Sequence, residues 1–417
     1  MRKQTKTTLS HTRKAALSVL LTALLFSLLF LSSCVPHTPA EPDFGSLTGS
    51  VPESAAESED LVRISPELFE LIPTEPVVDV HTEDQKAFLS GPYEQIGKYA
   101  DGRHECSKPE PLSLVWTFKT DGLPDGVPVP DSFTVFLDQT EAFDAPLVRT
   151  VSAEDGPDYE VFVDNLYLDT DYYWKVHAEC GEKAYESGVL SFKTAANGPR
   201  NLNVGGVSNV RDLGGWVIDE HHRVKQGMLF RGAAFEDLQY DTHITEDGIR
   251  TVRDELGVKT EIELRWVSVG EIEHRSDSLL GPDVRYLEFE FNYTDETLLT
   301  ANVMSIAKCF RRFADEKYYP IYYHCRIGTD RTGVLTYLLL GFLGVDKETL
   351  LTDYLFSNFG YVGGNRSVAT IQKAYIDLID ECEGETLQEK ITWYLINRCG
   401  MTEYNLEKIR TLLIEEF

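Results

Sequence analysis

The sequence is poor in basic residues and has no residue pattern typical of a metal site. Its 417 residues include 39 Lys and Arg against 68 Asp and Glu, which gives a formal net charge of -29. A charge of this sign repels nucleic acid and anionic surfaces at long range, so we expect no nucleic-acid partner. The cysteines form no CxxC pair and no Cys/His spacing of a zinc site, so we expect neither a metal ion nor another cofactor.

Long apolar runs are also scarce, and the one clear run lies near the N-terminus, at residues 15–31. Basic residues precede it, and the sequence LSSC ends it at Cys34, an order typical of an export signal. Residues 1–34 resemble a bacterial lipoprotein signal peptide, which implies cleavage before Cys34 and lipid attachment to its sulfur. We therefore expect a protein anchored to the membrane on the extracytoplasmic face of the cell envelope. An uncleaved anchor helix would give the same topology.

Beyond the signal, the composition predicts a multidomain chain. Residues 35–60 are rich in Pro, Ser, Glu and Ala and predict a disordered linker. Residues 61–197 contain short alternating strands separated by turn residues, among them LSLVWTF at 112–118 and YEVFV at 159–163, which predict an all-β sandwich. The stretch LYLDTDYYWKV and the following SFKT resemble the last strands of a fibronectin type III module, with Leu168 where that family usually has proline.

Two cysteines lie next to strands of this predicted sandwich. Cys106 precedes the strand at 112–118, and Cys180 ends the strand after LYLDTDYY. Disulfides can form outside the cytoplasm, so we hypothesise a bond between Cys106 and Cys180, although spacing alone does not fix connectivity.

Residues 198–417 predict strands that alternate with helices, as in an α/β domain with a mainly parallel sheet flanked by helices. Thr245 is a natural helix N-cap, and Gly257 would stop that helix before a strand at 259–265. A second helix places Val303, Ile306, Phe310 and Phe313 on one face. NVRDLGG, at 209–215, is interpreted as a tight turn in which Arg211 and Asp212 pair with each other.

The candidate catalytic residues lie in the sequence HCRIGTDRTG at 324–333, between a predicted strand and a predicted helix. Such a loop directs several backbone N–H groups to one point beside the positive end of the helix dipole, which makes an anion site. Cys325 starts the loop, where a nearby Arg331 and the dipole favour its thiolate. Arg331 can hold two phosphate oxygens, and the amides of residues 326–331 the others, so phosphoryl transfer to Cys325 and then to water becomes feasible. The Thr332 hydroxyl can donate to the sulfur as it leaves.

This stretch resembles the protein-tyrosine-phosphatase superfamily, whose signature is His, Cys, five residues, Arg, and Ser or Thr. The resemblance implies an α/β cysteine-phosphatase domain, a phosphocysteine intermediate and a phosphoprotein or small phosphomonoester substrate, with phosphotyrosine favoured over phosphoserine or phosphothreonine. The signature is met by His324, Cys325, Arg331 and Thr332, and the phosphate-binding loop by Arg326, Ile327, Gly328, Thr329 and Gly333.

Within that superfamily the domain is most similar to bacterial tyrosine phosphatases whose loop reads Cys, x, x, Gly, Lys, Asp, Arg, Thr, Gly. The resemblance makes Asp330 the general acid that protonates the leaving group, and Asp295, about 30 residues before the cysteine, is its rival. Thr329 stands where those relatives have lysine, which puts phosphoinositide activity in doubt. A phosphoinositide phosphatase and an inactive phosphate-dependent adhesion lipoprotein remain the alternatives. Arg265 and Glu271 could support the loop or be ordinary surface charges.

Overall fold

The computed structural model describes residues 62–156, 158–293 and 298–417. The described residues belong to one compact unit, Glu59–Phe417. The predicted signal peptide, Cys34, the predicted linker at 35–60 and the candidate acid Asp295 lie outside the described residues. Among the helices of the described ranges, none has the length and apolar character that a bilayer span requires.

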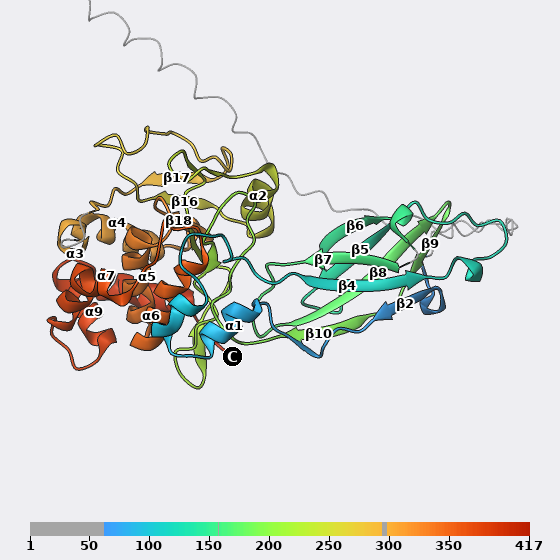
Figure 1. Ribbon diagram of the computed structural model, residues 1–417, viewed down its shortest axis with the longest axis horizontal. Coiled ribbons are helices and arrows are strands. Elements are labelled where there is room, and N and C mark those ends of the chain that lie inside the picture. Colours follow the sequence, from blue (N-terminus) through green and yellow to red (C-terminus); the bar gives the residue numbers. More distant parts are fainter. Residues whose placement is uncertain (1–61, 157, 294–297) are drawn as a thin grey trace, which may run out of the picture. The chain divides into compact units, whose positions relative to one another are not determined.

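Two β-sheets form in the first part of this unit and share one apolar core (Figure 1). The smaller sheet has the antiparallel order β2-β4-β7, in which β4 is the predicted strand LSLVWTF. The larger sheet centres on β8, whose alternate residues Tyr172, Trp174 and Val176 are buried, as expected for a strand with one face on a core. The strands are β1 Arg63–Ile64, β2 Phe69–Ile72, β3 Val77–Val78, β4 Leu112–Phe118, β5 Ser132–Asp138, β6 Leu147–Ser152, β7 Asp158–Val163, β8 Asp171–Cys180, β9 Lys183–Glu186 and β10 Leu190–Thr194.

One stretch inside the range predicted as sandwich packs elsewhere. Helix α1 (Glu83–Leu89) and the 3-10 helix η2 (Tyr93–Lys98) lie between β3 and β4 in the chain. Their residues Phe88 and Ile96 belong to the apolar core formed by the second part of the unit. Phe88 meets Phe359 with the ring centres 5.8 Å apart. A pattern of short strands and turns does not reveal such an excursion, because the helical stretch is too short to show a clear period.

The second part is built on a five-stranded sheet of order β11-β13-β18-β16-β17. The last four strands are parallel and β11 is antiparallel, so the sheet is mainly parallel, as predicted. The strands are β11 Arg211–Asp212, β13 Leu229–Gly232, β16 Thr260–Glu263, β17 Arg285–Glu288 and β18 Ile321–His324.

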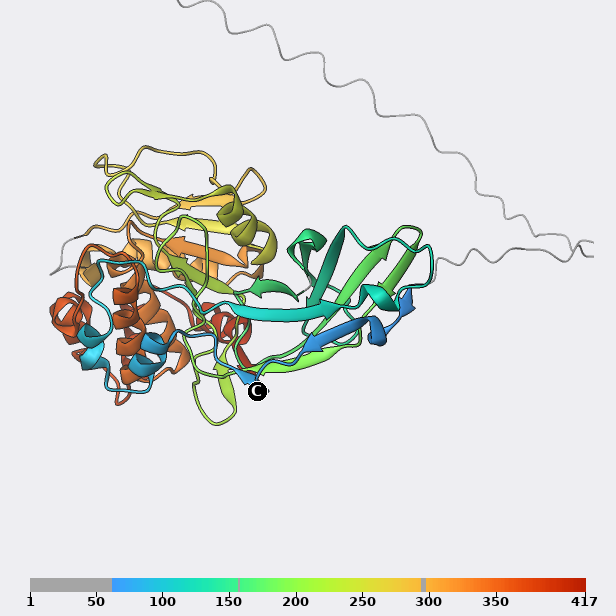
Figure 2. The same ribbon diagram turned by 45° about the vertical axis from the view of Figure 1, so that its right-hand side comes forward.

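Helices cover this sheet on both faces (Figures 1 and 2). Along β18, Ile321 and Tyr323 enter the core beneath the C-terminal helices, whereas Tyr322 enters the core on the face of α2. The principal helices are α2 Glu246–Arg250, α4 Val303–Phe313, α5 Asp330–Leu343, α6 Lys347–Phe356, α9 Leu387–Asn397 and α10 Glu403–Leu413. Shorter elements are α3 Leu298–Ala301, α7 Val368–Ile371, α8 Asp377–Asp380, the π-helices η5 Thr251–Glu255 and η8 Gln372–Ile376, and strands β12 His222–Val224, β14 Glu236–Asp237, β15 Thr242–His243 and β19 Ile414–Glu416.

The two helices predicted in detail are confirmed. The Thr245 hydroxyl accepts from the Gly248 amide at 3.1 Å and starts α2, and the chain continues through η5 to Gly257 in the left-handed region at φ +65°. Helix α4 buries Ile306, Phe310 and Phe313 on one face, as expected.

Candidate active site

Cys325 follows β18 directly and the loop after it leads into α5, so the predicted strand, loop and helix are all present. The cysteine is buried, with 2% of its surface exposed. Gly328 turns the loop at φ +69°, and a Cβ there would lie 2.2 Å from the backbone of Gly232. Only glycine therefore allows the loop to pass this close to β13.

The environment of Cys325 favours its thiolate. Burial alone would raise the pKa of this thiol, but the charge of Arg331 and the neighbouring hydroxyl and amide of Thr332 outweigh it, and the net pKa lies below the usual value. The other five described cysteines have a raised pKa, mainly because the surrounding protein partly or fully desolvates the thiol: Cys106, Cys180, Cys309, Cys382 and Cys399. Among the described cysteines, Cys325 is thus the one prepared to act as a nucleophile.

Arg331 is fixed by a two-pronged ion pair with Glu271. Nη1 and Nη2 of the arginine each lie 2.7 Å from one oxygen of the carboxylate. Burial tends to raise the pKa of Glu271, but the hydrogen bonds and charge of Arg331 dominate and lower it to about 2. The guanidinium also lies 5.4 Å from the ring centre of Tyr293. Its plane is therefore set before any anion arrives.

Asp330 opens α5 at the mouth of the loop and accepts hydrogen bonds from two other elements. Arg366 donates from Nε to Oδ1 at 3.2 Å and from Nη2 to Oδ2 at 3.3 Å. The Tyr293 hydroxyl donates to Oδ2 at 3.2 Å, and the Tyr354 hydroxyl lies 3.5 Å from Oδ1. The carboxyl is thus held beside Arg331 yet remains 7% exposed, where a leaving group can reach it.

His324 lies behind the cysteine, fully buried between acceptors. Its Nε2 is 2.9 Å from Oε1 of Glu261, and its Nδ1 is 3.3 Å from the carbonyl oxygen of Cys325. Burial tends to lower the pKa of His324, but the charge of Glu263 and the hydrogen bond with Glu261 raise it overall. Both ring nitrogens face oxygen acceptors, and the raised pKa favours the doubly protonated ring.

Glu261, Glu263 and His324 are also the described residues that come closest to a metal-binding set, with ligand atoms within 4.8 Å of one another. Arg265, however, donates to both oxygens of Glu263, at 3.0 and 2.7 Å. A cationic side chain thus engages both oxygens of Glu263, and the group is an ion-pair cluster.

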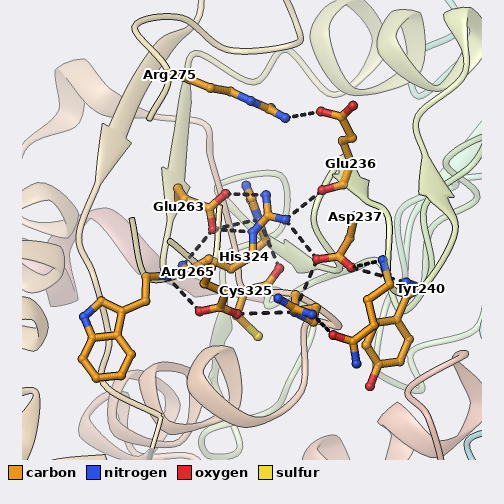
Figure 3. A network of polar contacts seen from close by, with 12 residues as sticks. Glu236, Asp237, Tyr240, Glu263, Arg265, Arg275, His324 and Cys325 are labelled. Atoms are coloured by element: carbon orange, nitrogen blue, oxygen red, sulfur yellow. Dashed lines mark hydrogen bonds and ion pairs between the residues drawn. The ribbon is translucent and has the colours of Figure 1, made fainter. Parts of the chain in front are cut away.

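Further ion pairs extend this cluster to Arg331, and Figure 3 shows the part of the network around Arg265, Glu263 and Asp237. Arg265 donates to Asp237 at 3.1 Å, and Nε of Arg326 lies 3.4 Å from Asp237 and 3.3 Å from Glu271. Anionic and cationic side chains therefore alternate from the buried end of β16 to the guanidinium of Arg331. In such a network the loss of one member leaves its partner charged and buried.

The floor of the loop is held by residues of the sequence NVRDLGG and of β13. Nδ2 of Asn209 donates to the Ile327 carbonyl at 3.0 Å and to the Thr329 hydroxyl at 3.2 Å. Nη2 of Arg231 donates to the Gly328 carbonyl at 2.7 Å. These bonds fix the loop carbonyls toward the protein, so the loop amides can face an anion.

The prediction that Arg211 pairs with Asp212 is wrong. Arg211 binds Asp353 of α6, with Nε 2.9 Å from Oδ1, and Asp212 binds Arg200, with Oδ2 2.8 Å from Nη1. The two residues form the strand β11, where neighbouring side chains point to opposite faces and cannot pair.

The hypothesis of a Cys106–Cys180 disulfide is also wrong, since both residues are free thiols. Cys180 ends β8 in the core of the sheets, whereas the amide of Cys106 donates to the carbonyl of Phe359 in the second part of the unit. The chain between β3 and β4 carries Cys106 away from the strand that it precedes in the sequence.

The structure brings together all the described residues that the sequence assigned to the site, from His324 to Gly333. Arg265 and Glu271, left open from the sequence, both belong to the supporting network. Thr329 is fully buried and bonded to Asn209, so it offers no substitute for a lysine charge. The supporting residues that the sequence did not reveal are Asn209, Arg231, Glu261, Glu263, Asp353 and Arg366.

One family profile covers all the residues of this site. The profile described as Tyrosine phosphatase family matches residues 202–415. A Cupriavidus necator protein named as a tyrosine-protein phosphatase is 28% identical over 190 residues, which cover 39% of this chain and 65% of that protein. The core catalytic domain of the PP-IP phosphatase SIW14 from S. cerevisiae aligns with a TM-score of 0.25 and 10% identity, over 36% of this chain and 83% of its own. P. aeruginosa TpbA aligns with a TM-score of 0.24 and 18% identity, over 45% of this chain and 86% of its own.

Proposed function

This chain belongs to the tyrosine phosphatase family, and we propose that it hydrolyses phosphate monoesters through a phosphocysteine on Cys325, with phosphotyrosine preferred. The observation that carries the proposal is the thiol of lowered pKa at the start of a loop whose arginine is already fixed over it. A thiolate in a cradle of N–H donors matches the needs of phosphoryl transfer.

In the first step, the loop amides and Arg331 hold the three non-bridging oxygens of the phosphate. The Cys325 sulfur attacks phosphorus, so an S–P bond forms while the P–O bond to the leaving group breaks and its electrons stay on that oxygen. Asp330 gives the oxygen its proton. The hydrogen-bond donors around Asp330, Arg366 and Tyr293, receive the carboxylate that results.

In the second step, water attacks phosphorus and the S–P bond breaks, with its electrons returning to sulfur. Asp330 takes the proton from the water, and the Thr332 hydroxyl, which lies close enough to Cys325 to lower its pKa, stabilises the leaving thiolate. Inorganic phosphate then leaves and the enzyme is restored.

The preference for phosphotyrosine is supported at the mouth of the site. The Tyr293 ring lies beside Arg331 and is 43% exposed, so a phenyl group could pack on it. The basic residues near the mouth, Arg326, Arg331 and Arg366, are each ion-paired with an acidic residue. A substrate with several phosphates would therefore find less free positive charge than one with a single phosphate on an aromatic ring.

We also propose that the protein is an exported lipoprotein anchored through Cys34, and that residues 61–197 contain a fibronectin type III-like module that holds or docks the enzyme. The support for export is the order of basic residues, apolar run and LSSC in residues 1–34. The support for the module is the pair of sheets around one core together with the LYLDTDYYWKV and SFKT stretches.

The experiment that tests the function is phosphate release by the purified full chain, with EDTA and reductant present, from phosphotyrosine, phosphoserine and phosphoinositide substrates. We expect turnover that is highest on phosphotyrosine and is lost in Cys325→Ser, because the hydroxyl cannot replace the thiolate. Absence of turnover in the wild-type protein, with phosphate still bound, would replace the proposal with a phosphate-dependent binding protein.

The choice of general acid has its own test. We expect Asp330→Asn to lower kcat on phosphotyrosine about 100-fold and to remove the alkaline limb of its pH profile. The fall in kcat should be smaller with p-nitrophenyl phosphate, because its leaving group needs little protonation. Asp295→Asn is the matched variant, and the assignment is reversed if that variant, and not Asp330→Asn, shows this behaviour.

A further inference from the structure

Residues 101–107 lie outside the matched family region and before β4, yet their backbone is bonded to the loop that follows α6. The amide of Gly102 donates to the Asn358 carbonyl at 2.8 Å, and the amide of Cys106 donates to the Phe359 carbonyl at 2.7 Å. The Gly102 carbonyl accepts from the amides of Val362 and Gly364, both at 3.0 Å. Four backbone hydrogen bonds thus fasten this segment, called here the 101–107 segment, to the loop at 358–364.

The loop at 358–364 leads to the arginine that holds the proposed general acid. The Asn358 side chain accepts from the Arg366 amide at 2.6 Å and donates to the Arg366 carbonyl at 3.1 Å. Arg366 then reaches both oxygens of Asp330. This series of hydrogen bonds is called here the first arm, and through it the position of Gly102 affects the position of the acid.

A second arm leads to the phosphate-binding loop. The Ser107 hydroxyl accepts from the Asn209 amide at 3.1 Å and donates to Glu105 at 2.6 Å. Asn209 in turn holds the loop through Ile327 and Thr329. Glu105 joins the two arms, because its other oxygen accepts from the Tyr361 amide at 3.3 Å.

We propose that the 101–107 segment is a positioning element of the catalytic site, in which Gly102 acts through Arg366 and Ser107 acts through Asn209. The inference rests on the proposed function, and it places part of the active-site scaffold between strands of the β-sheet region. Such contacts matter because a displacement of about 1 Å at a reacting group can lower the rate on the order of 100-fold.

The first arm is tested with a matched pair of glycine substitutions in the full chain. Gly102 has φ +72°, and a Cβ there would lie 2.6 Å from the Gly364 carbonyl oxygen, whereas a Cβ on Gly97 would meet nothing within 4 Å. We expect Gly102→Ala to lower kcat on the order of tenfold with KM changed less than about twofold, because Asp330 acts mainly in the transition state. Gly97→Ala should match the wild-type protein, with folding of both checked by thermal unfolding.

The second arm is tested by the affinity for an anion, independently of turnover. Tungstate should protect Cys325 from alkylation by iodoacetamide. We expect the tungstate concentration that gives half-maximal protection to rise several-fold in Ser107→Ala and in Glu105→Gln, a substitution at an exposed residue. Ser90→Ala, which removes a hydrogen bond at the end of α1, is the control and should leave protection unchanged.

Wild-type protection by tungstate in both Ser107→Ala and Glu105→Gln, or a wild-type kcat in a folded Gly102→Ala, would overturn the inference. Should Gly102→Ala fail to fold, the protection experiment decides alone. Absence of turnover in the wild-type chain would count against the proposed function and would leave the protection experiment as the test of this segment.

Discussion

At the scale of single residues, the site is a thiolate with its charges arranged in advance. The pKa of Cys325 is lowered while that of every other described cysteine is raised. Arg331 is fixed by Glu271, and His324 lies between two oxygen acceptors. Each of these arrangements exists without a ligand, so little reorganisation is needed when a phosphate binds.

Glu271 gives the sharpest residue-scale prediction. Replacing Glu271 with Gln removes the charge that fixes the fork of Arg331, so we expect kcat/KM to fall more than about tenfold and the free energy of unfolding to fall by about 1–3 kcal/mol. The Glu271 pKa of about 2 lies below that of an ordinary glutamate, so its stabilising effect is complete above about pH 4.3 and is lost as the pH falls toward 2.

Steady-state kinetics and urea unfolding at pH 7 and pH 3 measure both effects of Glu271→Gln. Glu273→Gln, a neighbouring carboxylate exposed to solvent, is the control. Equal kcat/KM in the two variants would show that Arg331 does not depend on this partner.

At the scale of elements, α6 is tied to two strands by one buried carboxylate. Asp353 binds Arg211 of β11 at 2.9 Å and Arg231 of β13 at 2.8 Å, and Arg231 continues to the Gly328 carbonyl. Burial tends to raise the pKa of Asp353, but the charges of the two arginines lower it overall. The packing of α6 and the shape of the phosphate-binding loop therefore depend on the same group.

We expect Asp353→Asn to lower the free energy of unfolding by about 3–5 kcal/mol, because two buried arginines lose their counter-charge. Since the folded pKa of Asp353 is depressed, the wild-type advantage should be complete above about pH 4 and vanish as the pH falls further. Chemical denaturation across this range, beside the exposed control Glu348→Gln on the same helix, measures the effect. A loss of less than about 1 kcal/mol at pH 7 would contradict it.

The sequence predicted the strand, loop and helix of the site because local signals determine them: the apolar run before Cys325, the loop glycine, and the helix that ends at Gly344 with φ +111°. It could not predict the partners of Arg211 or Arg331, which lie 142 and 60 positions away. A charged side chain gives no local signal of its partner. The sequence therefore suggested the neighbouring Asp212 as the partner of Arg211 in place of the distant Asp353. The packing of Phe88 and Ile96 in a core of the second part was not predicted because their helical stretch is too short to show a clear period.

At the scale of the whole molecule, the charge works against the substrate. A formal net charge of -29 repels phosphate dianions, while the alternating ion pairs around Arg331 confine the attraction to a short range. Screening shortens the reach of the repulsion from about 30 Å at 0.01 M salt to about 8 Å at 0.15 M.

We therefore expect kcat/KM for a phosphate monoester to rise several-fold as sodium chloride is increased from 0.01 to 0.15 M, the reverse of electrostatic steering. Initial rates at substrate concentrations far below KM measure this directly. The control is the alkylation of Cys325 by neutral iodoacetamide, whose rate should change little. A fall in kcat/KM over this range would show that the local cations govern substrate capture.

The chain passes three times between the core of the β-sheet region and the cores of the second part: between Val80 and Phe88, between Ala100 and Leu114, and between Phe192 and Leu202. A module that is joined to an enzyme by one linker can rotate about that linker, whereas a module joined by three crossings has no free hinge. A pull on the β-sheet region, such as capture by another surface, would reach the catalytic body through three tethers at once, and the middle tether contains the residues bonded to Asn209 and to Asn358, which in turn holds Arg366.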